Sequence, residues 1–386
     1  MAFSGLVALL VGIGFGRFGF TPLVPGLVQA GWFSAGVAGV LGASNLLGFM
    51  AGAHWSRLLL RYLSIPALLR ISMVAALASF AAGSLDWGFT WHLLARLVSG
   101  VAGGFAMALS VPAVLGATPA AKRGIVAGIL FAAMGIGIVI SGTVVPWLLG
   151  HSLPLAWLGF VAIGAPLAVL AWNGLPRGLP APPSNAQADA LGPMAAPVFL
   201  IAAGICLGAA AFAPHTVYWS DYIARELGLG NHIAGLYWIL LGLSACIVPT
   251  LLGMAADRIG FTLSLRLTLA GLAVAVALPA FASGSFVLAF SSLVVGGLGI
   301  SIASLGSGRT NRMVGPARHA AVWGKMVIGF GLSQAASGYL MAFLLARTGS
   351  YALLFAVGGG LALLGVAADW AAARLERRRG LAGTNA

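Results

Sequence analysis

The sequence contains very little charge. Only 7% of its 386 residues are Asp, Glu, Lys or Arg, whereas 60% are hydrophobic and the mean hydropathy is +1.03. An ordinary globular domain has about 25% charged residues, which help to cover a surface that faces water. The composition therefore excludes a water-soluble globular protein and predicts a chain that is solvated by lipid.

Cysteine and acidic residues are also scarce. The two cysteines, Cys206 and Cys246, both lie in apolar runs, which excludes a disulfide framework and gives no metal-binding motif. Seven acids stand against 20 basic residues, so the net charge is +13. No GxxxxGK[ST] phosphate loop occurs, which disfavours ATP-driven pumping, and we expect no cofactor and no bound metal.

Apolar runs that are long enough to cross a bilayer recur along the whole chain. A spanning helix needs about 20 apolar residues, and β-barrel strands would be shorter and would alternate apolar with polar residues. We therefore predict about twelve transmembrane helices, at residues 3–28, 34–54, 65–85, 89–115, 124–149, 155–175, 195–219, 234–255, 263–282, 286–305, 319–346 and 352–373.

The longest break between these runs lies almost at mid-chain. Residues 176–195 read PRGLPAPPSNAQADALGPMA, whose prolines and small polar residues are typical of a linker. GAHWSR at 52–57 and GMAADR at 253–258 lie 201 residues apart and suggest an internal repeat. We predict an all-α polytopic membrane protein with two pseudo-symmetric six-helix bundles, 1–175 and 196–373, the linker 176–195 and a basic cytoplasmic tail, 374–386.

The basic residues predict the orientation. If both termini are cytoplasmic, the outer loops hold only Arg225 and Arg347, and the other loops and the tail follow the positive-inside rule. The inner set is Arg57, Arg61, Lys122, Arg123, Arg177, Arg258, Arg309, Arg312, Arg318, Arg374, Arg377, Arg378 and Arg379. The positive charge thus indicates topology in a bacterial cytoplasmic (inner) membrane and contact with anionic headgroups, and we expect no nucleic-acid partner.

Several motifs resemble those of the major facilitator superfamily of secondary transporters. GMAADRIG (253–260) is similar to the family's loop signature, and RLVSGVAGG (96–104) to its fourth-helix motif. The first-half copy of the loop departs from the signature, with Ser56 in the place of the aspartate. GIGFGRFGFTPLVPGL (12–27) and GASNLLGFMAG (42–52) look like the uncharacterised YbfB/YjiJ-like branch. The resemblance implies a carrier whose two halves rock about a central site, and it implies no substrate.

The loop signature is a candidate conformational latch. A glycine allows two helices to cross closely, Asp257 can accept hydrogen bonds and Arg258 can pair across the half. Such contacts would form in one conformation and break in the other. The alternative is an ordinary inner-loop charge pair. The candidate latch residues are Gly253, Asp257, Arg258, Gly52 and Arg57.

Arg17 is the most informative candidate for the substrate site. It lies about 14 residues into the first predicted helix, near mid-membrane, where an arginine costs at least about 2.5–3.5 kcal/mol. We therefore expect it to face a cavity or a buried partner, and Gly14, Gly16 and Gly19 leave room beside it. Contact with an anionic substrate and the capping of buried carbonyls are the two alternatives.

Five further polar residues lie within predicted helices. Arg96 is a candidate for substrate contact or gating, but it could instead reach the outer interface. Lys325 could bind substrate or extend to the membrane surface. His215 could titrate near neutral pH, although a packing role is favoured. Asn45 and Gln334 could bind ligand or hold helices together, and we favour the helix-holding role for Asn45.

The position of the acids suggests the charge of the substrate. We expect none at the centre of a helix, with Asp221 at a helix edge, so a cavity with Arg17, Arg96 and Lys325 would attract organic anions and repel cations. Only His215 or Asp221 could carry a coupling proton, and anion exchange or uniport would need neither.

Three other functions are alternatives to an anion carrier. A drug or metabolite efflux carrier for neutral or amphiphilic compounds is the main alternative. A non-transporting sensor or scaffold would normally carry an added soluble domain. An enzyme would need a nucleophile–base pair or a metal cluster, whereas the histidines are dispersed: His54, His92, His151, His215, His232 and His319. We expect a monomeric transporter of a small solute, with membrane lipids as its other partners and no enzymatic activity.

Overall fold

The described residues of the chain, in a computed structural model, form helices and no strand. The described residues are 1–119, 122–178, 191 and 194–379. The first half contains α1 (Ala2–Leu9), η1 (Leu10–Phe15), η2 (Phe18–Leu23), α2 (Val24–Gln29), α3 (Ala35–Leu59), α4 (Ile65–Gly83), α5 (Gly88–Gly116), α6 (Arg123–Leu149) and α7 (Leu153–Ala171). The second contains α8 (Ala195–Ala211), α9 (Ala213–Asp221), η6 (Tyr222–Glu226), α10 (Gly230–Ile259), α11 (Phe261–Ala277), η7 (Leu278–Ala280), α12 (Ser285–Val314), α13 (Pro316–Thr348) and α14 (Tyr351–Arg378).

Twelve helical spans among these residues are long and apolar enough to cross a membrane, which confirms the predicted fold class. Serine side chains begin four of the helices. The hydroxyls of Ser34, Ser64, Ser152 and Ser350 accept hydrogen bonds from backbone N–H groups at the starts of α3, α4, α7 and α14. Such caps satisfy N–H groups that have no partner within the helix.

Two predicted segments differ from the structure or lie outside it. The predicted tail begins at residue 374, whereas α14 continues to Arg378, because Ala, Leu, Glu and Arg are all good helix formers. Most of the predicted linker 176–195 and residues 380–386 lie outside the described residues.

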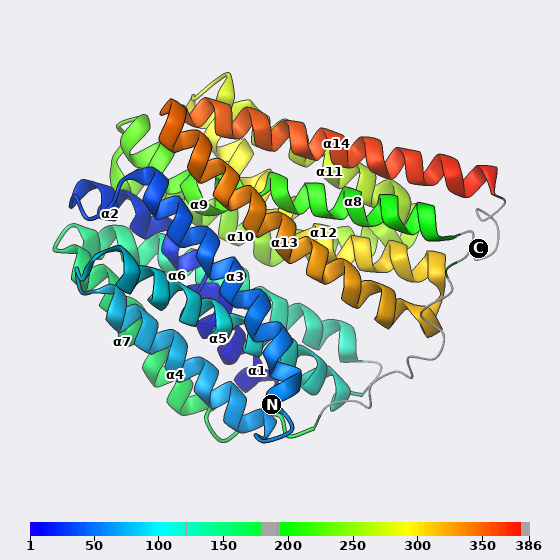
Figure 1. Cartoon of the computed structure of the whole chain (residues 1–386), viewed down its shortest axis with the longest axis horizontal. Helices are drawn as coiled ribbons and strands as arrows, with labels where there is room; N and C mark the ends of the chain where they lie inside the picture. The colour runs from blue at the N-terminus through cyan, green and yellow to red at the C-terminus, as the bar shows by residue number, and fades with distance from the viewer. Residues whose placement is uncertain (120–121, 179–190, 192–193, 380–386) are drawn as a thin grey trace.

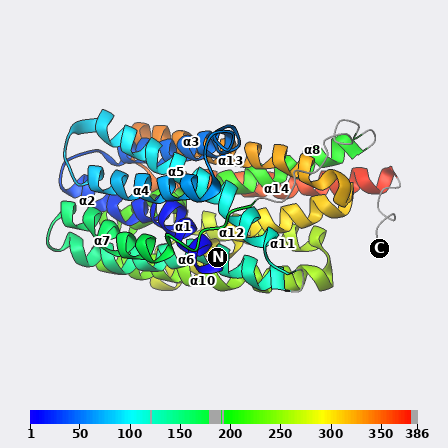
Figure 2. The ribbon, with the colours of Figure 1, turned by 90° about the horizontal axis from the view of Figure 1, so that it is seen from below.

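The spans pack as two groups, one from each half of the chain (Figure 1). Two antiparallel helix pairs join the groups, α3 with α13 and α6 with α10, and a view from below places each pair side by side (Figure 2). The irregular first span also contacts the seventh, where Thr21 Oγ1 donates to the Thr216 carbonyl oxygen. The region between the groups is therefore bounded by these helix pairs and by the two irregular spans.

Glycines spaced seven residues apart bring α6 and α10 into close contact. Gly142 meets Gly235, and Gly135 meets Gly242 and Cys246, so that backbone approaches backbone. Further along α6, a Cβ at Gly128 would find only Thr250 Oγ1, 4.0 Å away. At the next register positions, Gly124 and Gly253, nothing lies within 4 Å. The two helices have therefore separated at that end.

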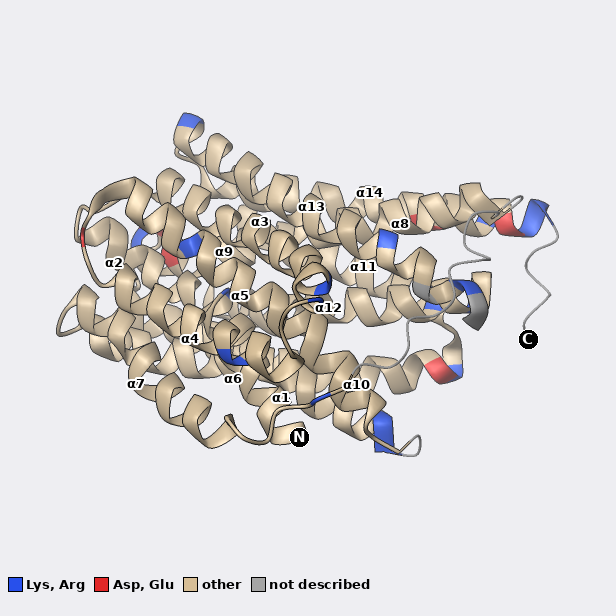
Figure 3. Ribbon diagram, turned by 60° about the horizontal axis from the view of Figure 1, so that its bottom comes forward, with Lys and Arg blue, Asp and Glu red and all other residues tan. Residues whose placement is uncertain are grey.

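The pair α3 and α13 diverges in the same direction. Gly36 packs against Ala346, and Gly338 packs against Ala43. Gly331 still meets Met50, but nothing lies within 4 Å of Gly324. We call this separated end the basic end, because Arg57, Arg123, Arg258 and Arg378 lie there, and the opposite end the closed end. Most blue segments in Figure 3 gather toward the basic end.

The glycine contacts yield a test with a matched control. We expect Gly135→Val to destabilise the protein by about 1–3 kcal/mol, because the new side chain would overlap Cys246 and the Gly242 carbonyl. Gly128→Val, on the same face of the same helix, should cost far less, since its Cβ has open space. Thermal unfolding of both purified variants in detergent measures the difference. An equal loss of stability in Gly135→Val and Gly128→Val would contradict the contact pattern.

Candidate functional site

The first span is interrupted near its middle, at Gly16 and Arg17. A π-helical turn, Leu10–Phe15, leads into the break, and a 3₁₀ segment, Phe18–Leu23, follows it. Pro22 within the 3₁₀ segment has no N–H group to donate to the preceding turn. A Cβ on Gly16 would overlap the Gly12 carbonyl oxygen, so the sharp change of pitch requires a glycine there.

Three side chains bind the backbone carbonyl of Gly16. Arg96 Nη1 donates to this oxygen over 2.7 Å, Ser99 Oγ over 3.1 Å and Asn45 Nδ2 over 3.2 Å. Asn45 Nδ2 also lies 3.3 Å from the Arg96 carbonyl oxygen. In a bilayer, which offers no water to an exposed carbonyl, these donors stabilise the break and hold the first span to α3 and α5.

Arg96 is enclosed within the first group and does not reach the outer interface. Only 2% of the residue is exposed, and its guanidinium carbon lies 4.4 Å from the centre of the Phe20 ring. Its Nε and Nη2 make no hydrogen bond with any described residue. In this conformation Arg96 therefore supports the backbone beside Arg17 and contacts no open space.

Arg17 points across the interface between the two groups. Its Nη2 donates to Oε1 of Gln334, on α13, over 2.9 Å. Ser44 on α3 and Tyr339 on α13 form another polar contact between the groups, 2.9 Å between their hydroxyl oxygens. Two of the predicted substrate residues, Arg17 and Gln334, are thus brought together from opposite halves of the chain.

No acidic side chain among the described residues forms an ion pair with Arg17. Ion pairs within the described part of the chain join Arg225 to Asp221, Arg266 to Asp369, and Arg309 to Asp369 and Glu376. Neither Arg17 nor Arg96 takes part in them. The interior around the helix break therefore carries positive charge that no described carboxylate neutralises.

The structure places His215 and Lys325 away from this contact. His215 is fully buried in the second group, where its Nε2 lies 2.8 Å from Ser291 Oγ and its ring stacks on Trp219. These contacts bury the His215 ring among side chains of the second group. Lys325 lies on an exposed part of α13, nine residues before Gln334.

The seventh span extends further than the predicted segment 195–219, and Asp221 lies at the end of α9, five residues before the span ends. The span continues to Glu226, and Asp221 is fully buried. Arg225 donates from Nε and Nη2 to its two oxygens over 2.6 and 2.9 Å, and the Tyr351 hydroxyl also donates to it. The prediction ended the helix too early, because Ser220, Asp221 and Arg225 look like the polar end of a span when their partners are unknown.

The candidate latch residues are separated in this conformation. Asp257 and Arg258 are exposed near the end of α10, and neither makes a hydrogen bond or ion pair with a described residue. Arg57 is exposed at the end of α3, whereas Gly52 packs against the backbone of Val101 in α5. All candidate latch residues except Gly52 therefore face open space. This is consistent with the separation of the two groups at the basic end.

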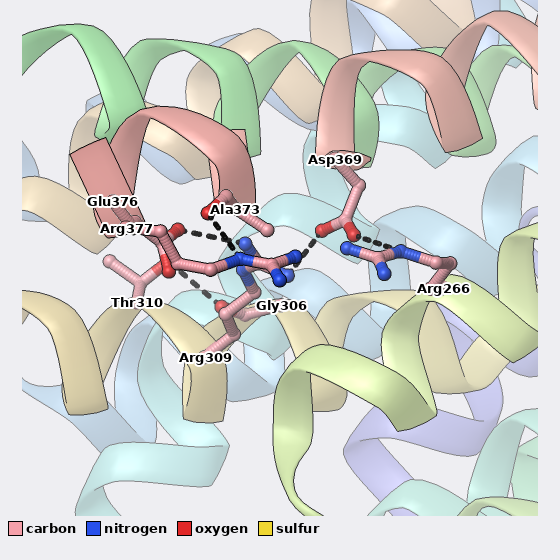
Figure 4. Close-up of polar contacts among 8 residues, drawn as sticks. All are labelled: Arg266, Gly306, Arg309, Thr310, Asp369, Ala373, Glu376 and Arg377. Carbon is pink, nitrogen blue, oxygen red and sulfur yellow. Dashed lines mark hydrogen bonds and ion pairs between the residues drawn. The ribbon is translucent and has the colours of Figure 1, made fainter. Parts of the chain in front are cut away.

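The second group contains a buried ion-pair network at the basic end (Figure 4). Asp369 of α14 is fully buried, with Arg266 Nε 3.1 Å from Oδ2 and Arg309 Nη1 2.5 Å from Oδ1. Arg309 Nη2 also lies 2.8 Å from Oε1 of Glu376. The network ties α11, α12 and α14 together. At the same 201-residue offset the first half has Ile65, Ala108, Ala168 and Leu175, so the network is confined to the second group.

The geometry can be compared with known proteins. Residues 9–370 match the model of a family described as uncharacterised MFS-type transporter YbfB. The chain belongs to this family of transporters. No curated protein matches the sequence.

Solved structures of other transporters share the fold at low sequence identity. The nucleoside transporter NupG superposes with a TM-score of 0.74 at 14% identity, covering 97% of this chain and 100% of that one. The D-xylose–proton symporter gives 0.71 at 17% identity over 95% and 96%. A bacterial homologue of the human lysosomal transporter Spinster, inward-facing and unoccupied, gives 0.71 at 14% identity over 97% and 96%. These similarities establish the fold alone.

The sequence did not reveal that Arg96, Asn45 and Ser99 donate to the same acceptor, the Gly16 carbonyl oxygen. Arg96 and Asn45 were each identified as polar residues in apolar helices, but their common acceptor is a backbone carbonyl, and every residue has one. Ser99 was also missed, because an isolated serine in a glycine-rich helix carries little signal. The four closely spaced glycines around Arg17 were the available indication that the helix is irregular there.

The ion-pair network yields a stability test. Asp369→Asn leaves Arg266 without a carboxylate partner and Arg309 with Glu376 alone, so we expect a loss of about 3–5 kcal/mol. Asp257→Asn, which also removes an acid from the basic end, should change stability by less than about 0.5 kcal/mol, because Asp257 is exposed. Thermal unfolding of both purified variants in detergent measures the two losses of stability. An Asp369→Asn variant as stable as the wild type would contradict a structural role for the network.

Proposed function

We propose that the chain is a secondary active transporter that moves a small organic anion across the bacterial cytoplasmic membrane by alternating access. The observation that carries this proposal is Arg17. It lies at the helix break of the first span, reaches Gln334 on the opposite group, and has no acidic partner among the described residues.

The Arg17 guanidinium supplies the anion-binding chemistry. In this conformation one of its nitrogens is bound to a neutral amide oxygen, which is a weaker acceptor than a carboxylate or phosphate oxygen. An entering anion would take the place of Gln334 on Arg17, while the Gln334 side chain could turn its N–H₂ toward the anion. The anion would then bridge the two groups.

The open basic end supports the transport cycle. Closing it would require Gly124 to approach Gly253 and Gly324 to approach the end of α3, while the glycine contacts at the closed end release. Rocking of two bundles about a midplane site is the mechanism that such repeats permit. We propose that Gly253, Asp257 and Arg258 on one side, with Gly52 and Arg57 on the other, form the latch of the closed basic end.

The positive-inside rule supports the orientation. With the basic end, where α1 begins and α14 ends, in the cytoplasm, both chain termini would be cytoplasmic and this conformation would be open inward. The proposed units are the bundles 1–175 and 196–373, and the protein acts as a monomer. Coupling to protons would use His215 or Asp221, the two candidates in the seventh span. Anion exchange would need no such group.

Ligand-dependent thermal stability tests the substrate class. We expect one class of small carboxylate or phosphate compounds to stabilise the purified protein by about 2.7 kcal/mol at a hundredfold excess over Kd. Arg17→Gln should lose about 2–5 kcal/mol of the binding free energy, because it removes the charge that pairs with the anion. Arg61→Gln, a charge removed from an exposed loop, should bind as the wild type does.

The same screen includes neutral solutes and organic cations of matched size. Stabilisation by these compounds only, equal in the wild type and in Arg17→Gln, would contradict the anion proposal. A neutral or amphiphilic substrate of an efflux carrier would then be the better interpretation.

A further inference from the structure

The last helix is longer than a bilayer requires. α14 has 28 residues and is therefore about 42 Å long, whereas the hydrocarbon core is about 30 Å thick. About 20 of its residues, from Tyr351 to Trp370, are enough to cross the core. The last two turns, which carry Arg374, Arg377 and Arg378, then lie at the level of the lipid headgroups.

One face of α14 forms a continuous exposed stripe. Leu363 is 60% exposed and Trp370, two turns later, is 44% exposed. Arg374 follows one turn after Trp370, and its guanidinium carbon lies 3.4 Å from the centre of the Trp370 ring. An open, shallow surface cavity of about 540 Å³ is lined by Trp370, Arg374, Arg377 and Arg378. The stripe thus runs from an apolar side chain through an interfacial indole to a cluster of arginines.

The acids of this segment face away from the stripe. Asp369 is bound by Arg266 and Arg309, and Glu376 is bound by Arg309 (Figure 4). The arginine side chains on the exposed face are therefore not neutralised by the two carboxylates of their own helix. Arg377 is also positioned, since its Nε donates to the Ala373 carbonyl oxygen over 3.4 Å.

We propose that this cavity binds the phosphate of an anionic phospholipid headgroup. Arginine presents planar pairs of N–H donors that match phosphate oxygens, and a guanidinium stacked on an indole keeps its edge free to donate. The indole lies at the boundary between headgroup and acyl chain, where tryptophan is enriched in membrane proteins. The acyl chain packs along Leu363. A soluble phosphate would gain the arginine contacts but not the apolar ones.

The assignment is independent of the transported solute. It uses residues of α14 alone, at the lipid-facing surface of the second group, and no residue of the Arg17–Gln334 contact. The ion-pair network would couple the site to α11 and α12, because Asp369 and Glu376 are on the same helical turns as the arginines.

Lipid binding to the intact protein tests the proposal. The detergent-solubilised full chain is titrated with phosphatidylglycerol or with phosphatidylcholine, and bound lipid is counted by native mass spectrometry. We expect phosphatidylglycerol to be retained and phosphatidylcholine to be lost. The double variant Arg374→Gln/Arg377→Gln should bind phosphatidylglycerol about 10- to 30-fold more weakly. The control Arg61→Gln/Lys122→Gln removes the same charge from exposed positions at the same end and should bind as the wild type does.

Two outcomes would overturn the proposal. Equal phosphatidylglycerol binding by the two double variants would show that the lipid responds only to net charge. Inorganic phosphate is the second probe, at the same concentration as the lipid headgroup. If it raised the unfolding temperature of the wild type as much as phosphatidylglycerol does, the site would be one for soluble phosphate.

Discussion

The rest of the structure depends on satisfying the backbone where the first span breaks. A broken helix inside a bilayer exposes carbonyl groups that no water can reach, and the Gly16 oxygen meets this constraint by accepting from Arg96, Ser99 and Asn45. Their convergence on one atom fixes the first span to α3 and α5. Because the break is fixed, the next residue, Arg17, is held at the interface between the two groups.

The contacts between the groups combine tight and loose regions along the same helices. Glycine pairs such as Gly142 with Gly235 bring the backbones together at the closed end, whereas Gly124 and Gly253 are separated at the basic end. Small residues are suited to an interface that must form and release, since they pack closely without interlocked long side chains. The second group is stiffened at the basic end by the Asp369 network, which favours its motion as one body.

Much of the fold and part of the site could be predicted from the sequence. The lengths of the apolar runs predicted the twelve spans, because hydropathy distinguishes segments solvated by lipid from segments solvated by water. The depth of Arg17 in the first span identified it as a residue that needs a polar partner. The sequence could not reveal that Gly16 is the shared acceptor, because a backbone carbonyl has no sequence signature. It also ended the seventh helix before Asp221, since burial of this acid depends on Arg225 and Tyr351, and Tyr351 is 130 residues away.

The most direct test of the account is the distance between the basic ends of α6 and α10 in the presence of ligand. Spin labels on Gly124→Cys and Gly253→Cys, with Cys206 and Cys246 replaced by alanine, report this distance by pulsed electron paramagnetic resonance. If an anion on Arg17 bridges the two groups, the stabilising anion should shorten the distance in the wild type and leave it unchanged in Arg17→Gln. An unchanged distance in the wild type, or the same shortening in Arg17→Gln, would contradict the account.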